Sequence, residues 1–205
     1  APMRETLAAG LLMLADYNDE PMIDPCCGSG TLLIEAAWMK QKRPPGCLRE
    51  HWGFQGLPGF KREEWEAVKA ELDARHVPDV KLGFLGIDCD KRMIESAKEN
   101  LKAAGLERGI SLIKSEFLDA PVRAESTFLM TNPPYGRRLG EEKELEPLYA
   151  EIGDFIKHKV AKPGRAYVYT GSLHLAKRVG LRTKRRLKVD NGGAEGRLLE
   201  FEVFE

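Results

Sequence analysis

The stretch PMIDPCCGSGT, residues 21–31, joins a short apolar run to a turn that contains two glycines. Residues 32–40 (LLIEAAWMK) follow it and are rich in residues that favour a helix. A strand, a glycine turn and a helix in succession form the opening unit of a doubly wound α/β domain. This stretch therefore predicts a Rossmann-like fold.

The rest of the chain repeats this alternation. The apolar runs predict strands at 82–87, 110–114, 128–131 and 165–170, and helices at 4–15, 91–104, 143–159 and 173–179. Two alternating runs, 183–189 and 197–204, flank Asn191-Gly192-Gly193, which is typical of a hairpin. We expect one doubly wound, seven-stranded sheet with helices on both faces and its last strand antiparallel.

One segment, residues 43–79, interrupts the alternation after the first crossover helix. It contains several prolines, glycines and aromatic residues, and residues 61–75 within it have the apolar spacing of a helix. Because ordinary connections are much shorter, we expect an insertion packed on the domain. It could be a lid or a substrate-facing segment, or its tryptophans could only cover apolar surface.

Composition limits the class of protein. The chain has 205 residues, 42% hydrophobic and 31% charged, which fits a single globular domain spanning residues 1–205. No apolar run reaches the roughly 20 residues that span a bilayer, so no membrane partner is expected. The four cysteines lack metal-ligand spacing, which favours reduced thiols in a cytosolic, cytoplasmic protein.

The formal charge is balanced, with 32 basic and 32 acidic residues. This balance is unusual for a stand-alone nucleic-acid binder, which generally carries a basic excess. The basic residues are nevertheless concentrated between 177 and 188, where a phosphate-binding surface and an ordinary solvated face are both open interpretations.

The glycine turn is the first candidate site. Gly30 is followed by Thr31 without a lysine, so the turn is not a P-loop, and Leu33 replaces the third glycine of a dinucleotide turn. A smaller anion such as an amino-acid carboxylate fits better, and Asp24 could meet the accompanying ammonium group. The predicted ligand-binding residues of this stretch are Asp24, Cys27, Gly28, Ser29, Gly30 and Thr31.

Two acidic positions follow the next two strands. Asp88, with Asp90 beside it, lies where a carboxylate accepts ribose hydroxyls, although Asp90 could also cap the following helix. Glu116 and Phe117 could hold the amino group and the flank of an adenine, with an ordinary exposed glutamate as the alternative. An amino-acid carboxylate, a ribose and an adenine are together the parts of S-adenosylmethionine.

The tetrapeptide Asn132-Pro133-Pro134-Tyr135 follows the apolar run 128–131. It is good turn chemistry by itself. A pocket built here would also present an amide, a carbonyl and an aromatic face, groups suited to holding a planar NH2 group for alkylation. We therefore expect Asn132, Pro133 and Tyr135 to be catalytic, with Asn132 also next to the cofactor.

These motifs resemble class I methyltransferases, and more narrowly the THUMP-associated RNA guanine-N2 methyltransferases. The segments that carry the resemblance are PMRETLA at 2–8, DPCCGSGT at 24–31, GIDCD at 86–90 and NPPYGRRLG at 132–140. The insertion, with HWGF at 51–54 and FKREEW at 60–65, is most similar to that of bacterial members acting on 23S rRNA. NPPY alone is shared with adenine-N6 and glutamine-N5 methyltransferases, so the narrower identification depends on the flanking motifs.

The resemblance implies S-adenosylmethionine-dependent methylation of a guanine N2 in 23S rRNA, with no metal required. A guanine in tRNA, an adenine N6 in DNA or RNA, and a catalytically silent RNA-binding scaffold are the alternatives. The family also carries an RNA-binding THUMP region upstream of the first motif, so we expect this chain to be a fragment. Arg137 and Arg138, or the basic run 177–188, could hold flanking phosphates.

Overall fold

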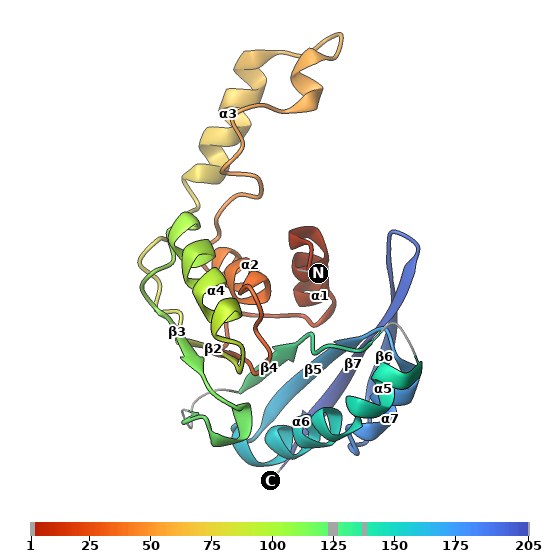
Figure 1. Ribbon diagram of the computed structural model, residues 1–205. Helices are drawn as coiled ribbons and strands as arrows, with labels where there is room; N and C mark the ends of the chain where they lie inside the picture. The colour runs from red at the N-terminus through yellow and green to blue at the C-terminus, as the bar shows by residue number, and fades with distance from the viewer. Residues whose placement is uncertain (1–2, 123–126, 137–138, 205) are drawn as a thin grey trace.

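The computed structural model describes residues 3–122, 127–136 and 139–204. Its strands form one sheet in the order β3-β2-β1-β4-β5-β7-β6 (Figure 1). All neighbouring pairs are parallel except those that involve β7, which is antiparallel to both β5 and β6. The seven-stranded sheet with its last strand antiparallel is therefore confirmed. The strands are β1 (Met22–Asp24), β2 (Phe84–Asp88), β3 (Ile110–Lys114), β4 (Phe128–Thr131), β5 (Gly164–Thr170), β6 (Arg185–Asn191) and β7 (Ala194–Val203).

Helices cover both faces of this sheet, and the strand side chains alternate between the two layers. Met22 of β1 packs with the apolar cluster under α1, α2 and α4, while its neighbour Ile23 packs with the cluster under α6 and α7. Successive strand residues point to opposite faces, so a strand covered on both sides must be apolar throughout. The short apolar runs at β1 and β4 therefore predict strands correctly. The covering helices are α1 (Glu5–Leu14), α2 (Thr31–Lys40), α4 (Lys91–Ala103), α6 (Glu146–Lys159) and α7 (Leu173–Arg178).

The expected helix 143–159 is interrupted. The structure has α5 (Leu139–Glu144) and then α6, with Leu145 between them and Pro147 in the first turn of α6. A proline inside a continuous helix would lack its N–H donor and clash with the carbonyl four residues earlier, whereas the first turn tolerates it. Pro147 therefore fixes a new helix start that the apolar spacing did not reveal.

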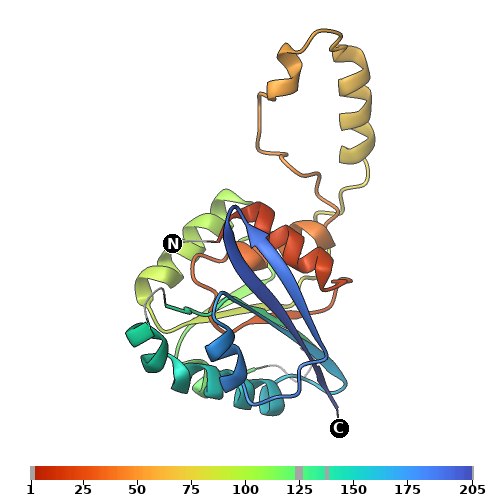
Figure 2. The same cartoon turned by 90° about the vertical axis from the view of Figure 1, so that its right-hand side faces the viewer.

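The insertion projects from the body as an arm, which we define as residues 43–79 (Figures 1 and 2). It contains a 3-10 turn, η1 (Gly53–Gly56), and α3 (Arg62–Asp73), in which no residue is buried. Trp52, Phe54 and Trp65 pack on one another with ring centroids 4.9–5.7 Å apart. The expectation of a segment packed on the domain thus differs from the structure, because these aromatic side chains cover each other rather than the body.

The neck of the arm is closed by hydrogen bonds. Val77 N donates to Gln41 O at 2.8 Å, and Gln41 Nε2 donates to Pro78 O at 2.8 Å. Arg43 donates to Ala104 O at 2.6 Å and stacks over Trp38. The arm therefore leaves and rejoins the body at one place. Across the described ranges, no helix combines the length and apolar character that crossing a bilayer would require.

Candidate functional site at the carboxyl ends of the parallel strands

The candidate site lies where β2, β1 and β4 end side by side. After β1 the chain continues to β2 and β3 on one side, and later returns as β4 on the other side of β1. This reversal of strand order is a topological switch point, the usual ligand site of an open α/β sheet. The sequence motifs that follow these strands, led by Asp24, Asp88 and Asn132, are therefore brought to one edge.

The glycine turn needs two left-handed residues. Gly28 has φ +53° and Gly30, directly before α2, has φ +83°, conformations that other residues rarely adopt. Cys27 N donates to Ile87 O at 2.9 Å, which fixes the turn to the end of β2. The thiol of Cys27 is buried, and the expected contact of this residue with a ligand stays a prediction. The hydroxyls of Ser29 and Thr31 lie 3.4 Å apart at the start of α2.

Asp88 connects the turn to β2. Its Oδ2 accepts from Gly28 N at 3.0 Å and its Oδ1 from Asp90 N at 2.9 Å. An ionised carboxylate can accept about four hydrogen bonds, so two backbone bonds leave capacity for two ligand hydroxyls. The structure thus holds Asp88 against the glycine turn, and its expected ribose contact stays a prediction.

Asp90 caps α4. Its Oδ1 accepts from Arg92 N at 2.8 Å, and its carboxylate forms an ion pair with the Arg92 guanidinium. These bonds lower the pKa of Asp90. The capping role anticipated for Asp90 is present, and its expected ribose contact stays a prediction.

The two residues predicted to contact the adenine differ in solvent exposure. Glu116 is exposed, in the loop after β3. Phe117 is buried and meets Phe155 of α6 edge to face, with ring centroids 5.5 Å apart. The Phe117 ring therefore belongs to the core beneath the sheet edge, where it supports the loop that carries Glu116.

Asp24 is a buried polar residue that connects the glycine turn to the end of β4. Its Oδ1 accepts from Thr131 Oγ1 at 2.8 Å and from Cys26 N at 3.1 Å, and only 1% of the residue is exposed. The pKa of Asp24 is raised to about 7, mainly because the carboxyl group is buried; its two hydrogen bonds oppose this rise and the nearby charge of Asp88 adds to it. Thr131, which no sequence motif indicates, thus anchors the end of β4 to the start of the glycine turn.

Asn132 follows Thr131 directly. Its side-chain Oδ1 is buried and has no hydrogen-bond partner among the described residues. An unpaired buried acceptor costs free energy, so it needs a physical reason, and a donor supplied by a ligand, a water molecule or an ion is such a reason. Pro133 is buried and Tyr135 is half-buried beside it. Arg137 and Arg138 lie outside the described residues.

The basic run 177–188 is largely neutralised within the fold. Arg178 pairs with Glu146 at 3.0 Å, and Lys188 pairs with Glu195 at 2.5 Å across the β6–β7 hairpin. Lys184 and Arg185 both pair with Glu200 of β7. Many of the basic side chains that could bind phosphates thus form ion pairs that connect α7 to α6 and β6 to β7.

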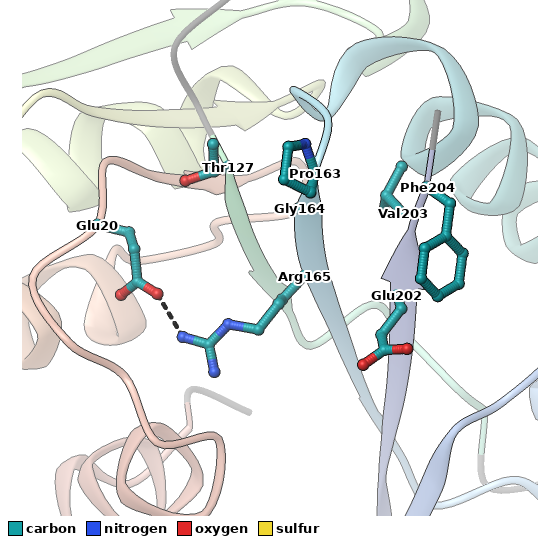
Figure 3. Close-up of a pocket in the computed structure, with 8 residues that line it drawn as sticks. All are labelled: Glu20, Thr127, Pro163, Gly164, Arg165, Glu202, Val203 and Phe204. Atoms are coloured by element: carbon teal, nitrogen blue, oxygen red, sulfur yellow. Dashed lines mark hydrogen bonds and ion pairs between the residues drawn. The ribbon is translucent and has the colours of Figure 1, made fainter.

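A cavity of about 260 Å³ lies at the other end of the parallel strands, near the residues where β1, β4 and β5 begin (Figure 3). Arg165, at the start of β5, extends across it to form an ion pair with Glu20 and lies over the Phe128 ring at 5.3 Å. Its guanidinium also donates to Ala15 O at 2.9 Å. These contacts give Arg165 a structural role, away from the predicted site.

Comparison with known proteins agrees with this geometry. The sequence profile of the RMKL-like methyltransferase domain matches residues 1–200. The chain is 38% identical over 216 residues to a ribosomal RNA large subunit methyltransferase K/L from Syntrophotalea carbinolica, covering all of this chain and 30% of that protein. It therefore spans less than a third of that relative's length.

Two solved structures are also similar. One is SMU.472 complexed with SAH, at TM-score 0.89 and 30% identity over all of this chain and 54% of that one. The other is a predicted N6-adenine-specific DNA methylase from Listeria monocytogenes, at TM-score 0.84 and 30% identity over 98% and 51% of the two chains. The fold, the switch-point site and the match along nearly the whole sequence show that this chain belongs to the RMKL-like methyltransferase family.

Proposed function

We propose that this domain transfers a methyl group from S-adenosylmethionine to the exocyclic N2 of a guanine in RNA, most specifically in 23S rRNA. The observation that carries the proposal is the unpaired, buried Oδ1 of Asn132. It lies directly after the strand that Asp24 fixes to the glycine turn, so an N–H donor bound there would be held beside the cofactor site.

The residues present suit the cofactor. The first N–H groups of α2, which have no acceptor within the helix, can bind its carboxylate. Asp88 has unused acceptor capacity for the ribose hydroxyls. SAH in the similar structure SMU.472 is what such a cofactor becomes after it donates its methyl group.

The catalytic task of the chain is to hold the acceptor nitrogen. Asn132 Oδ1 and the Pro133 carbonyl would each accept one N–H of the guanine amino group, which draws that nitrogen toward tetrahedral geometry and frees its lone pair. Tyr135 would stack on the base, which must first leave its own stack. The cofactor supplies an activated methyl group on a sulfonium. Positioning is therefore the main contribution of the protein.

Nucleoside mass spectrometry tests the proposal. The protein is incubated with unmodified 23S rRNA or tRNA and methyl-labelled S-adenosylmethionine, and the digested RNA is analysed for labelled nucleosides. We expect labelled N2-methylguanosine in 23S rRNA. Label found only in tRNA would show that tRNA, and not 23S rRNA, is the substrate. Binding of S-adenosylmethionine without transfer to any RNA would favour a catalytically silent scaffold.

A second candidate, methylation of adenine N6, has one specific observation in its favour. The similar protein from Listeria monocytogenes is named as an N6-adenine-specific DNA methylase, and the planar NH2 group of adenine would satisfy Asn132 in the same way. The same digest separates the two, because N6-methyladenosine and N2-methylguanosine are distinct nucleosides. DNA is included as a third substrate.

The chain spans only part of its relatives, and we place part of the RNA-binding surface of the whole protein outside it. The balanced charge of 32 basic and 32 acidic residues supports this placement, because phosphate contacts dominate RNA affinity. An upstream THUMP region is the element we propose for that role.

A further inference from the structure

The ring of Tyr135 lies against a glycine from another strand. A Cβ atom added to Gly171 would lie 2.7 Å from Cε2 and 3.0 Å from Cδ2 of Tyr135, distances that real side chains do not tolerate. Gly171 directly follows β5, the strand that pairs with β4 next to the tetrapeptide. The edge of the aromatic ring therefore rests on the bare backbone of Gly171.

The backbone itself does not require glycine at this position. The φ angle of Gly171 is outside the left-handed region in which eleven other glycines of the chain lie. A left-handed backbone is therefore not the reason for glycine here, whereas the contact with the Tyr135 ring is one.

The residues on either side of Gly171 are held firmly. Thr170 Oγ1 lies 2.8 Å from the buried Tyr149 hydroxyl of α6 and accepts from Ser172 N at 3.1 Å. Ser172 Oγ in turn accepts from Leu175 N at 3.1 Å, which caps α7. A methyl group at position 171 would therefore displace the half-buried Tyr135 ring rather than the anchored backbone.

We infer that Gly171 is a positioning residue that sets the plane of the Tyr135 ring on which the target base stacks. The inference rests on the proposed function, because it assigns Tyr135 the stacking role. The Tyr149–Thr170–Ser172 network is the support that keeps this surface in place. Neither residue chemistry nor spacing marks Gly171 in the sequence; only the contact shows it.

The first test measures the kinetics with which variants methylate unmodified 23S rRNA. Gly171→Ala is expected to lower kcat/KM about tenfold, mainly through KM for the RNA, because base stacking of this size is what the displaced ring loses. Affinity for S-adenosylmethionine, measured by calorimetry, should not change. Gly10→Ala is the matched control, since its added methyl group would meet nothing within 4 Å.

Double variants show whether the effect passes through the ring. Adding Gly171→Ala to Tyr135→Ala should cost nothing further, while adding it to Tyr135→Phe, which keeps the ring, should cost the same tenfold as in the native protein. An equal cost in all backgrounds, or no cost in any, overturns the inference.

A second measurement does not depend on activity. The protein has five tyrosines, so isotope-labelled tyrosine rings give few NMR signals, and Tyr135→Phe identifies the one from Tyr135. Gly171→Ala should shift that signal and leave those of Tyr17 and Tyr167 in place; an unmoved Tyr135 signal overturns the inference. If the native protein forms no N2-methylguanosine, the proposed function fails, and this spectrum still decides where the ring lies.

Discussion

Asn132 carries a buried oxygen that the described part of the protein leaves without a donor, and this separates its effect on catalysis from its effect on stability. Asn132→Ala removes the acceptor for the target amine, so we expect methyl transfer to fall by about a thousandfold or more. The unfolding free energy should stay unchanged or rise by about 1 kcal/mol, because an unsatisfied polar group is lost. Single-turnover assays and urea unfolding measure the two effects. Transfer at the native rate would remove Asn132 from the mechanism.

Asp88 binds through a different part of the site. Asp88→Ala removes the acceptor proposed for the ribose and also the partner of Gly28 N, which positions the glycine turn. We expect the affinity for S-adenosylmethionine to fall at least tenfold, since one charge-assisted hydrogen bond contributes about 1.5–3 kcal/mol. Calorimetry measures this directly. Asn132→Ala is the internal control, because its cofactor affinity should remain nearly native.

Asp24 gives a prediction on pH. Its pKa in the folded protein is about 7, against an ordinary value of 3.8, so the folded state holds the proton more tightly than the unfolded state. Its contribution to stability is therefore complete below about pH 4 and is lost as the pH rises through about 7. Asp24→Asn keeps an acceptor at Oδ1 without the charge.

The stability of this variant relative to the native protein should therefore increase between about pH 4 and 8, by on the order of 2–4 kcal/mol. Thermal or urea unfolding across this pH range measures the difference. A difference that does not vary with pH would show that Asp24 titrates normally in the folded protein.

At the scale of elements, the strands and most helices could be predicted because their residues are buried on one or both sides. β4 reads as an uninterrupted apolar run, and its residues Phe128 and Leu129 enter different core clusters. The split between α5 and α6 was missed because apolar spacing continues through Leu145, and only Pro147 marks the boundary.

The site was predicted as separate motifs, but its internal connections were not. Thr131 and Asp24 are 107 residues apart in the sequence, and no local pattern indicates that their side chains bond. No local pattern indicates the contact between Gly171 and Tyr135 either, because these residues follow two different strands of the sheet. Spacing identifies which residues reach the edge of a parallel sheet, whereas the contacts among them depend on the packing of the whole sheet.

The arm illustrates a related limit and yields a prediction. Its length led us to expect a segment packed on the domain, but its aromatic rings cover each other and α3 has no buried residue. Replacing residues 44–76 by a short Gly-Ser linker should therefore leave the fold and the affinity for S-adenosylmethionine intact, because the neck at Gln41 and Val77 stays closed. Calorimetric unfolding and binding measure this. An unfolded variant would show that the arm stabilises the body.

At the scale of the whole molecule, the distribution of charge predicts weak binding of RNA by this chain alone. Formal charge is zero, and three basic residues in or next to β6, Lys184, Arg185 and Lys188, pair with glutamates of β7. Few phosphates can then be neutralised. We expect a dissociation constant for 23S rRNA in the micromolar range or weaker at physiological salt, with a shallow dependence on salt.

The matched comparison adds the upstream THUMP region that we propose for RNA binding. If a basic region there grips the backbone, affinity and the slope of log K against log salt should both increase, by roughly one unit of slope for each phosphate gained. Glu195→Gln on this chain is the internal control, because it releases Lys188 and Arg197 from their ion pairs and should steepen the slope slightly. Tight, strongly salt-dependent binding by the unmodified chain would instead place the RNA-gripping surface within these 205 residues.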